Sequence, residues 1–309
     1  MKFALINYLF VLFCFTLLTG CNNSSAAKEP LENPTKKELD LRPATVLSED
    51  FKSYWYSDQA ELTSYKLEQA RYGELRDGHA VLIYVTEVFL TGKQVKTDSP
   101  NSESISILKL NSTKNYSTGI YPYSVMQSTF YPVANNQHAI KVSSSMQEWC
   151  GHVYSQINNR NQFEVILHSY FEGEADQEFK LNKSYLENEI WTQLRIDPTT
   201  LPQGEIDIIP SLEYLRYRHS QVKPYKATGR LETGKYELYY PELERSLIIN
   251  FNPEFPYEIE SWEETFNSGY GPSAQKLTTK ATKLKQLNTP YWRQNRNVNE
   301  VLQDSLMIR

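Results

Sequence analysis

The 309-residue chain is predicted to be mainly β (a β-rich α+β protein), with a curved antiparallel sheet or partly closed barrel and two or three short helices. Tyrosine is abundant, with 22 residues, and its side chain suits a pleated, half-buried surface. Segments of strand-like composition follow one another with short turn signals between them. No period of 20–50 residues recurs, which excludes a solenoid or a propeller.

The N-terminal residues are predicted to be a leader and a linker. Lys2 precedes a mostly apolar run, residues 3–18, which is shorter than the roughly 20 residues of a membrane-spanning helix. A basic start, an apolar middle and small residues at the end are typical of a secretory signal peptide, here residues 1–20. Residues 21–46 are polar and contain three prolines, which predicts a flexible tether.

The β-rich domain is predicted over residues 47–309. Ser48 followed by two acids indicates an N-cap, and "FKSYWY" behind it predicts a short helix with an aromatic face. Asp77-Gly78 separates two strand-like segments and predicts the turn of a β-hairpin. Residues 80–85 are apolar on both faces, as expected of a central strand covered from both sides.

One segment in the middle of the chain is predicted to be helical. Residues 184–187 fit a capping box, and the apolar spacing behind them predicts a helix over residues 185–194. Strands are predicted to resume after this helix and to include residues 211–220, "SLEYLRYRHS". The interruption near residues 173–204 is where the domain could divide in two.

Charge and cysteine content exclude several functions. The formal net charge of −5 argues against nucleic acid as a partner, because binding phosphates needs a concentrated positive field. Cys14 leaves with the leader and Cys21 is expected to carry lipid, so only Cys150 remains and no internal disulfide can form. No complete catalytic, metal-binding or cofactor motif is present, so we assign no catalytic residue, no metal and no cofactor.

Three patterns approach known sites without completing them. Residues 229–235 match the start of a P-loop, but Tyr236 replaces the Mg²⁺-binding Ser or Thr, so a hairpin turn is predicted. Cys150 and His152 would lie about 6.5–7 Å apart along one strand, too far for a thiolate–imidazole pair, which predicts a buried structural cysteine. Acidic residues gather at 172–176 and at 260–264, and the second group could supply an acid–base pair.

The one basic segment of the chain is the candidate binding surface. Cations and tyrosines alternate along it, and a strand would place the cations on one face. Such a face could meet an anionic headgroup or a glycan, or could be only the polar side of a strand. Its residues are Tyr214, Arg216, Tyr217, Arg218, His219, Lys223, Lys226 and Arg230.

Leu18-Thr19-Gly20-Cys21 resembles the lipobox of bacterial lipoproteins. The resemblance implies cleavage between Gly20 and Cys21, followed by acylation of the Cys21 thiol and of its new amine, for example with palmitate. Several acyl chains anchor a protein stably, because each buried methylene contributes roughly 0.8 kcal/mol. Asn22, with no acidic run behind it, implies an outer-membrane anchor with the domain facing the periplasm.

A wider resemblance is carried by "TSYKLEQARYGELRDGHAVLIYVTEVF", "STGIYPYSVMQSTFYPV" and "QEWCGHVYSQINNR". Over most of residues 50–270 the chain resembles a group of uncharacterised lipoproteins from Bacteroidota, some of which are labelled "septum formation inhibitor Maf". The Maf family is cytoplasmic and hydrolyses non-canonical nucleoside triphosphates. Its S-x-S-x-R-R element has no counterpart here, so no Maf residue role carries over. The second half of the chain also resembles a β-rich envelope domain family.

These observations predict a lipid-anchored cell-envelope protein that binds a lipid, a glycan or a protein partner in envelope maintenance. One alternative is an envelope hydrolase whose carboxylates come together across strands. The other is a Maf-like nucleoside triphosphate pyrophosphatase, which the signal peptide and the missing motif disfavour.

Overall fold

The computed structural model describes residues 46–134 and 137–308. The predicted signal peptide, nearly all of the predicted tether, and the lipobox residues Gly20 and Cys21 lie outside the described residues. These described residues belong to one compact unit.

A single mainly antiparallel sheet of 16 strands forms the framework, so the predicted fold class is confirmed. Its order is β10-β11-β12-β13-β14-β15-β16-β1-β2-β4-β5-β6-β7-β8-β9, with β3 paired beside β2, and only β10 and β11 run parallel. The strands are β1 (Ala60–Arg71), β2 (Glu74–Leu90), β3 (Val95–Lys96), β4 (Ser104–Thr118), β5 (Tyr121–Pro132), β6 (Lys141–Glu148), β7 (Gly151–Asn159), β8 (Phe163–His168), β9 (Gln177–Leu181), β10 (Tyr185–Leu186), β11 (Gly204–Ile209), β12 (Tyr225–Glu232), β13 (Lys235–Tyr240), β14 (Arg245–Phe251), β15 (Ile259–Ser268) and β16 (Gln275–Thr289).

The helices are short. The predicted first helix is confirmed, because Ser48 caps it by accepting a hydrogen bond from the backbone N–H of Phe51 at 3.1 Å. The predicted middle helix begins later than expected, because residues 185–186 form β10 and Glu189 accepts from the Leu186 N–H at 3.2 Å. The helices are α1 (Glu49–Trp55), α2 (Glu187–Ile196), α3 (Leu212–Arg218) and α4 (Val301–Ser305), with 3₁₀ turns η1 (Pro198–Thr200), η2 (Gly271–Ser273), η3 (Tyr291–Arg293) and η4 (Asn297–Glu300).

The hairpin predicted at Asp77-Gly78 is wrong, since both residues lie inside β2. The turn is formed instead by Tyr72 and Gly73, whose φ angles of 54° and 77° match the left-handed geometry of a tight hairpin. Gly78 serves another purpose. A Cβ there would lie 2.3 Å from the carbonyl oxygen of Asn115, so only glycine permits this close approach of β2 and β4.

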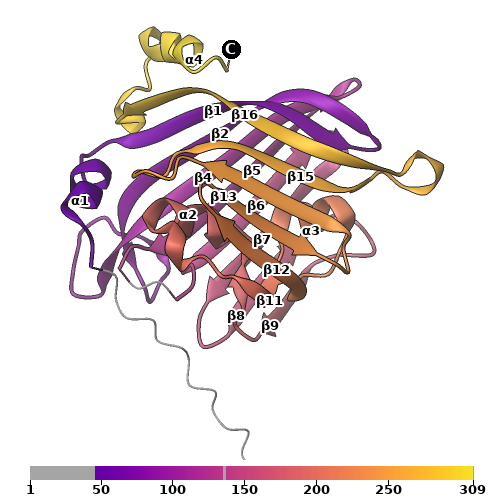
Figure 1. The fold of residues 1–309 in the computed structure, drawn as a ribbon, viewed down its shortest axis with the longest axis horizontal. Helices are drawn as coiled ribbons and strands as arrows, with labels where there is room; N and C mark the ends of the chain where they lie inside the picture. The colour runs from indigo at the N-terminus through magenta and orange to yellow at the C-terminus, as the bar shows by residue number, and fades with distance from the viewer. Residues whose placement is uncertain (1–45, 135–136, 309) are drawn as a thin grey trace, which may run out of the picture. The chain divides into compact units, whose positions relative to one another are not determined.

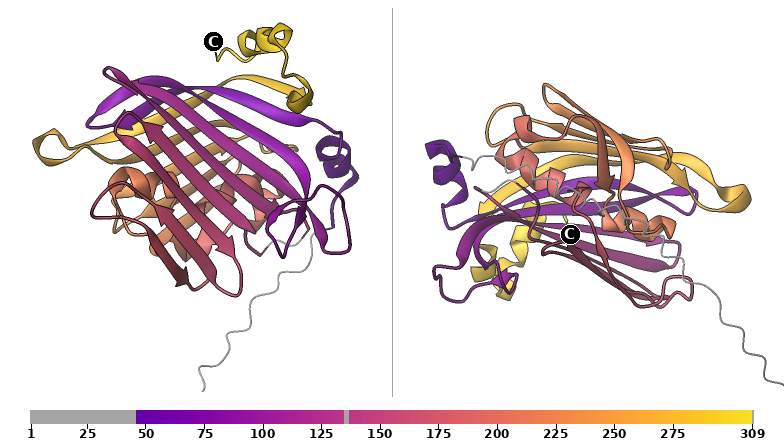
Figure 2. Two further views of the ribbon diagram at one scale, coloured as in Figure 1. Left: turned by 180° about the vertical axis from the view of Figure 1, so that it is seen from behind. Right: turned by 90° about the horizontal axis from the view of Figure 1, so that it is seen from below.

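The sheet curls around α2 and α3 (Figures 1 and 2). Helix α3 contacts both halves of the sheet: Glu213 accepts from Lys114 of β4 at 2.8 Å, and the Tyr214 ring packs edge-on against Phe266 of β15. Residues 173–204, the predicted point of subdivision, contain both edge strands of the sheet: residues 182–184 lead directly from β9 to β10, and α2 follows β10. Residues 80–85, predicted to be a buried central strand, lie in β2 and are almost wholly buried.

Helix α2 is held at both ends by buried ion pairs. At its first residue, Glu187 accepts two hydrogen bonds from the guanidinium of Arg245 on β14, at 2.5 and 2.7 Å. At its C-terminal end, Arg195 donates from both terminal nitrogens to Glu61 on β1, each at 2.6 Å. An acid at the start of a helix and a cation at its end also match the helix dipole.

Each guanidinium is further enclosed by aromatic rings. Arg195 lies 5.0 Å from the Trp55 ring and 4.7 Å from the Tyr84 ring, and its Nε donates to the backbone carbonyl of Pro256. Arg245 lies 4.2 Å from the Tyr214 ring. Buried charges are tolerated only when they are paired and hydrogen-bonded, and both pairs meet this condition.

Removing one partner of such a pair should cost far more than removing both. We expect Arg195→Leu to lower the free energy of unfolding by about 3–5 kcal/mol, because it leaves the buried Glu61 carboxylate uncompensated. The double variant Glu61→Leu/Arg195→Leu should be clearly more stable than this single variant. Urea unfolding followed by circular dichroism measures both.

The exposed pair Lys52–Glu49 in α1 supplies the control. Lys52→Leu should change stability by no more than about 1 kcal/mol, as is usual for exposed ion pairs. A double variant less stable than Arg195→Leu would contradict a structural role for the pairing itself.

Candidate functional site

The prediction of a strand for the basic segment is wrong in the first part of that segment, because residues 212–218 form α3. Ser211 caps this helix by accepting from the Tyr214 N–H at 3.2 Å, and His219 ends it in the left-handed conformation. The alternation of tyrosine and arginine imitated a strand. It arises instead because the helix is enclosed on several sides, so Tyr214 and Tyr217 are both buried in the core.

The predicted cations do not form one surface. Lys226 and Arg230 lie exposed on β12, where they pair with Asp207 and Glu232 at 2.9 and 2.7 Å. The Arg218 side chain donates to the backbone carbonyl of Gly269 and covers the Tyr270 ring. The remaining three cations, Arg216, His219 and Lys223, line one groove.

This groove, of about 770 Å³, lies between α3 with its following loop and the inward faces of β7, β8 and β9. We call it the α3 groove. Its apolar wall includes side chains of Leu167, Phe179 and Leu181 that are only half-buried. These side chains are at the β9 edge of the sheet. The apolar lining comprises Val153, Leu167, Phe179, Leu181, Leu212, Leu215 and Val222.

A cluster of charged side chains marks the polar end of the α3 groove, in which Arg216 is buried, Glu174 is half-buried and His219 is exposed. His219 Nδ1 donates to Glu174 Oε1 at 2.5 Å, and Arg216 Nη1 donates to the same oxygen and to His219 Nε2, both at 3.3 Å. The Arg216 guanidinium also lies 4.1 Å from the Phe171 ring. Its Nε is buried and has no hydrogen-bond partner among the described residues. A buried donor without a partner is costly, so an ordered water is the expected partner of this atom.

A second polar group lies in the interior, between the halves of the sheet. Three carboxylates from different elements converge there: Glu187 of α2, Glu213 of α3 and Glu264 of β15. The sequence pointed only to Glu264, as part of the acidic group at residues 260–264. Its neighbours Glu260 and Glu263 instead pair with Lys283 and Lys280 at the surface.

The convergence of carboxylates is what an envelope hydrolase would need, but the surroundings favour a structural role. The cavity between them has a volume of about 40 Å³, which holds a few water molecules and no sugar. Each carboxylate also has a fixed cationic partner, since Arg245 binds Glu187 and Glu264 while Lys114 binds Glu213.

The two carboxylates on Arg245 are electrostatically different. Burial would raise the pKa of Glu187, but the charge and hydrogen bonds of Arg245 outweigh it, so the pKa lies below its usual value. Burial raises the pKa of Glu264, and the single hydrogen bond from Arg245 Nε, at 2.7 Å, does not compensate. Ionised Glu187 therefore stabilises the fold, whereas ionised Glu264 carries a cost.

The other motif-like patterns resolve as ordinary structure. The P-loop-like residues form the predicted hairpin between β12 and β13, in which the backbone of Glu232 lies opposite that of Lys235 in the strand register. The prediction of a buried Cys150 is wrong, because it lies exposed in the turn between β6 and β7. A hydrogen bond with Glu148 raises the pKa of its thiol, which disfavours the nucleophilic thiolate.

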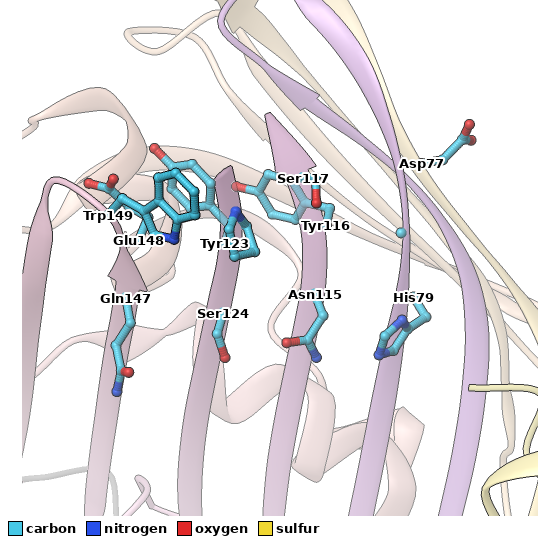
Figure 3. A pocket seen from close by; sticks show the side chains of 12 residues that line it. Asp77, His79, Asn115, Tyr116, Ser117, Tyr123, Ser124, Gln147, Glu148 and Trp149 are labelled. Carbon is cyan, nitrogen blue, oxygen red and sulfur yellow. The ribbon is translucent and has the colours of Figure 1, made fainter. Parts of the chain in front are cut away.

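A further groove, of about 580 Å³, lies on the sheet where β2, β4, β5 and β6 run side by side (Figure 3). No signal in the sequence pointed to it, because its residues come from four separate strands. In the described part of the chain, no three His, Cys, Asp or Glu side chains are placed to hold a metal ion. Nor does any helix within residues 46–134 and 137–308 have the length and hydrophobicity to cross a membrane.

Comparison with known proteins gives a fold likeness only. The chain matches no protein-family model and no curated protein. Among solved structures it is similar to a beta-barrel-like protein of domain of unknown function DUF1849 from Brucella abortus, with a TM-score of 0.44 and 7% sequence identity. The likeness covers 74% of this chain and 97% of that one.

The contrast between the two glutamates on Arg245 can be measured. We expect Glu187→Gln to lower the free energy of unfolding at pH 7 by about 3–5 kcal/mol, because Arg245 loses its main counter-charge. Glu264→Gln should cost less than about half of that, because it removes a carboxylate whose ionisation is disfavoured by folding. Urea unfolding at about pH 4 and pH 7 tests both variants.

The two variants should also differ in their pH dependence. Glu187 has a lowered pKa in the folded state, so its contribution is complete above its ordinary value of 4.5 and is lost as the pH falls below it. Glu264 has a raised pKa in the folded state. The wild-type protein therefore loses stability as the pH rises from the ordinary pKa of this carboxyl through the raised one, and Glu264→Gln removes this loss. Equal effects of the two substitutions at both pH values would contradict the assignment.

Proposed function

We propose that this chain is a lipid-anchored protein of the cell envelope that binds an amphipathic lipid in the α3 groove. The observation that carries the proposal is the groove itself. It combines a wall of half-buried apolar side chains with a charged group at one end. Its volume of about 770 Å³ falls within the 300–1,000 Å³ typical of small-molecule sites.

The apolar wall suits an acyl chain. Leu167, Phe179 and Leu181 face the groove from the last two strands of the sheet, and no further strand or helix covers the β9 edge among the described residues. Covering such side chains removes apolar surface from water, which is favourable by roughly 25 cal/mol per Å². An aliphatic ligand would cover the half-buried apolar side chains on the inward face of the β8–β9 hairpin.

The charged end suits a headgroup that carries both donors and acceptors. Arg216 and Lys223 place two cations along the groove. Glu174, Asp176 and Glu178 line the same groove, so the local charge is mixed. A zwitterionic or hydroxylated headgroup matches this mixture better than a purely anionic one.

The membrane anchor is supported by the N-terminal sequence. The basic start, the apolar run and Leu18-Thr19-Gly20-Cys21 together resemble a lipoprotein leader. Acyl chains on Cys21 would hold the domain at the outer membrane, and the polar residues behind it would give it reach. A lipid-binding groove on a domain tethered near a bilayer would act in the maintenance of that envelope.

Lipid binding should depend on the apolar wall of the groove. We expect Phe179→Asp to lower the lipid-bound fraction of the purified full chain at least about tenfold, because it places a charge where an acyl chain would pack. Native mass spectrometry of protein extracted with mild detergent measures that fraction directly.

Lys180→Ser provides a control on the same strand, since Lys180 points away from the groove and is exposed. This variant should retain the wild-type bound fraction. Circular dichroism should show that both variants remain folded. Wild-type protein without bound lipid across several preparations would count strongly against the proposal.

The anchor has a separate test. We expect Cys21→Ser to move the protein from the membrane fraction to the soluble fraction of the envelope, because the thiol that receives the lipid is absent. Cys150→Ser, which alters the exposed cysteine of the β6–β7 turn, should remain in the membrane fraction. Membrane association that survives Cys21→Ser would refute acylation as the anchor.

A further inference from the structure

A row of uncharged polar side chains crosses four neighbouring strands on the face of the sheet opposite to α3. The sheet register places His79 of β2 opposite Asn115 of β4, Asn115 opposite Ser124 of β5, and Ser124 opposite Gln147 of β6. Figure 3 shows the four side chains next to one another and pointing the same way. They form the floor of the 580 Å³ groove, which we call the outer groove.

The hydrogen-bonding capacity of this row is unused. The side chains of His79, Asn115, Ser124 and Gln147 make no hydrogen bond or ion pair with any other described residue. Amide and hydroxyl groups both donate and accept, and a neutral imidazole does the same through its two nitrogens. Partial burial lowers the pKa of His79, which keeps its ring neutral at pH 7. The floor therefore presents alternating donors and acceptors without a charge, as a ligand rich in hydroxyl groups requires.

The spacing of the row is set by the sheet. Neighbouring strands lie about 4.8 Å apart, so the four groups are regularly spaced along a line that crosses the strands. Successive pyranose rings of an extended β-linked glycan repeat at a similar distance. A straight oligosaccharide laid across the strands would thus meet one polar side chain per sugar unit.

An exposed indole stands beside the row, just past the end of β6 (Figure 3). Trp149 occupies the turn between β6 and β7, lines the outer groove and is 69% exposed. Its ring lies 6.4 Å from that of Tyr121, which supports it from one side. A pyranose ring has an apolar C–H face and polar edges, so an aromatic face beside hydrogen-bonding groups matches both of its surfaces.

The surroundings argue against other classes of ligand. The charged residues that line the outer groove are Asp77 and Glu148, and two carboxylates disfavour a phosphate-bearing ligand. All four strands are paired on both sides, so a peptide cannot add to them as a further strand. The polar floor also gives an acyl chain no apolar surface to pack against. We propose that the outer groove is a binding site for an extended, uncharged, β-linked oligosaccharide.

Isothermal titration calorimetry of the purified full chain tests the proposal with three tetrasaccharides. Chitotetraose and cellotetraose are extended and β-linked, whereas maltotetraose is α-linked and curved. We expect a β-linked tetrasaccharide to bind and maltotetraose to bind at least about fivefold more weakly. Trp149→Ala should weaken binding at least about tenfold, the loss expected from one aromatic stacking partner. The double variant Asn115→Ala/Gln147→Ala should weaken it about fivefold or more.

Trp292→Ala is the matched control, because Trp292 is an exposed tryptophan of η3 outside the outer groove. It should bind like the wild type. All the substituted side chains are on the surface or in a turn, and circular dichroism should show wild-type folding. The proposal is overturned if wild-type protein binds none of the three sugars at millimolar concentration, if Trp149→Ala binds as well as wild type, or if maltotetraose binds as tightly as the β-linked sugars.

Discussion

The clamping of α2 by two buried ion pairs is the interaction on which the rest of the fold depends. Glu187 binds Arg245 of β14 and Arg195 binds Glu61 of β1, so the two ends of one helix hold strands that are three positions apart in the sheet. An open sheet of this length has no hydrogen bonds to close it, and its curvature needs another source. The helix supplies it, because the charged groups at its ends are compatible with burial only where their partners meet them.

This arrangement also determines where ligands can bind. Since α2 and α3 fill the inside of the curl, the carboxylates there face a cavity of about 40 Å³ and hold the strands together. Space for a ligand is left at the β9 edge, where α3 and the inward faces of β7 to β9 enclose a groove, and on the opposite face of β2, β4, β5 and β6. A half-barrel without internal helices would be expected to bind ligands at its centre. In this protein the space for a ligand is instead the α3 groove at the β9 edge and the outer groove on the opposite face.

Local sequence patterns predicted the fold class and α1, because tyrosine-rich strands and an N-cap such as Ser48 act through neighbouring residues. They could not predict the clamps, whose partners are separated by 58 and 134 residues. Nearly all residues of α2 are buried although many are polar, and each buried charge needs a partner, but this burial is visible only in the structure. Helix α3 was missed because tyrosine–arginine alternation has the period of a strand, and only packing against both halves of the sheet reveals the helix.

The two proposed sites lie on opposite faces of the sheet and share neither strands nor side chains. On β7, Val153 lines the α3 groove, whereas its neighbour His152 is exposed on the opposite face. On β6, Gln147 belongs to the outer groove, whereas the adjacent Met146 is buried in the core. Successive residues of a strand point to opposite faces, so substitutions in one groove leave the chemistry of the other unchanged. The same strict alternation explains why one sheet can carry an apolar wall on its inward face and a polar row on its outward face, and why either site can exist without the other.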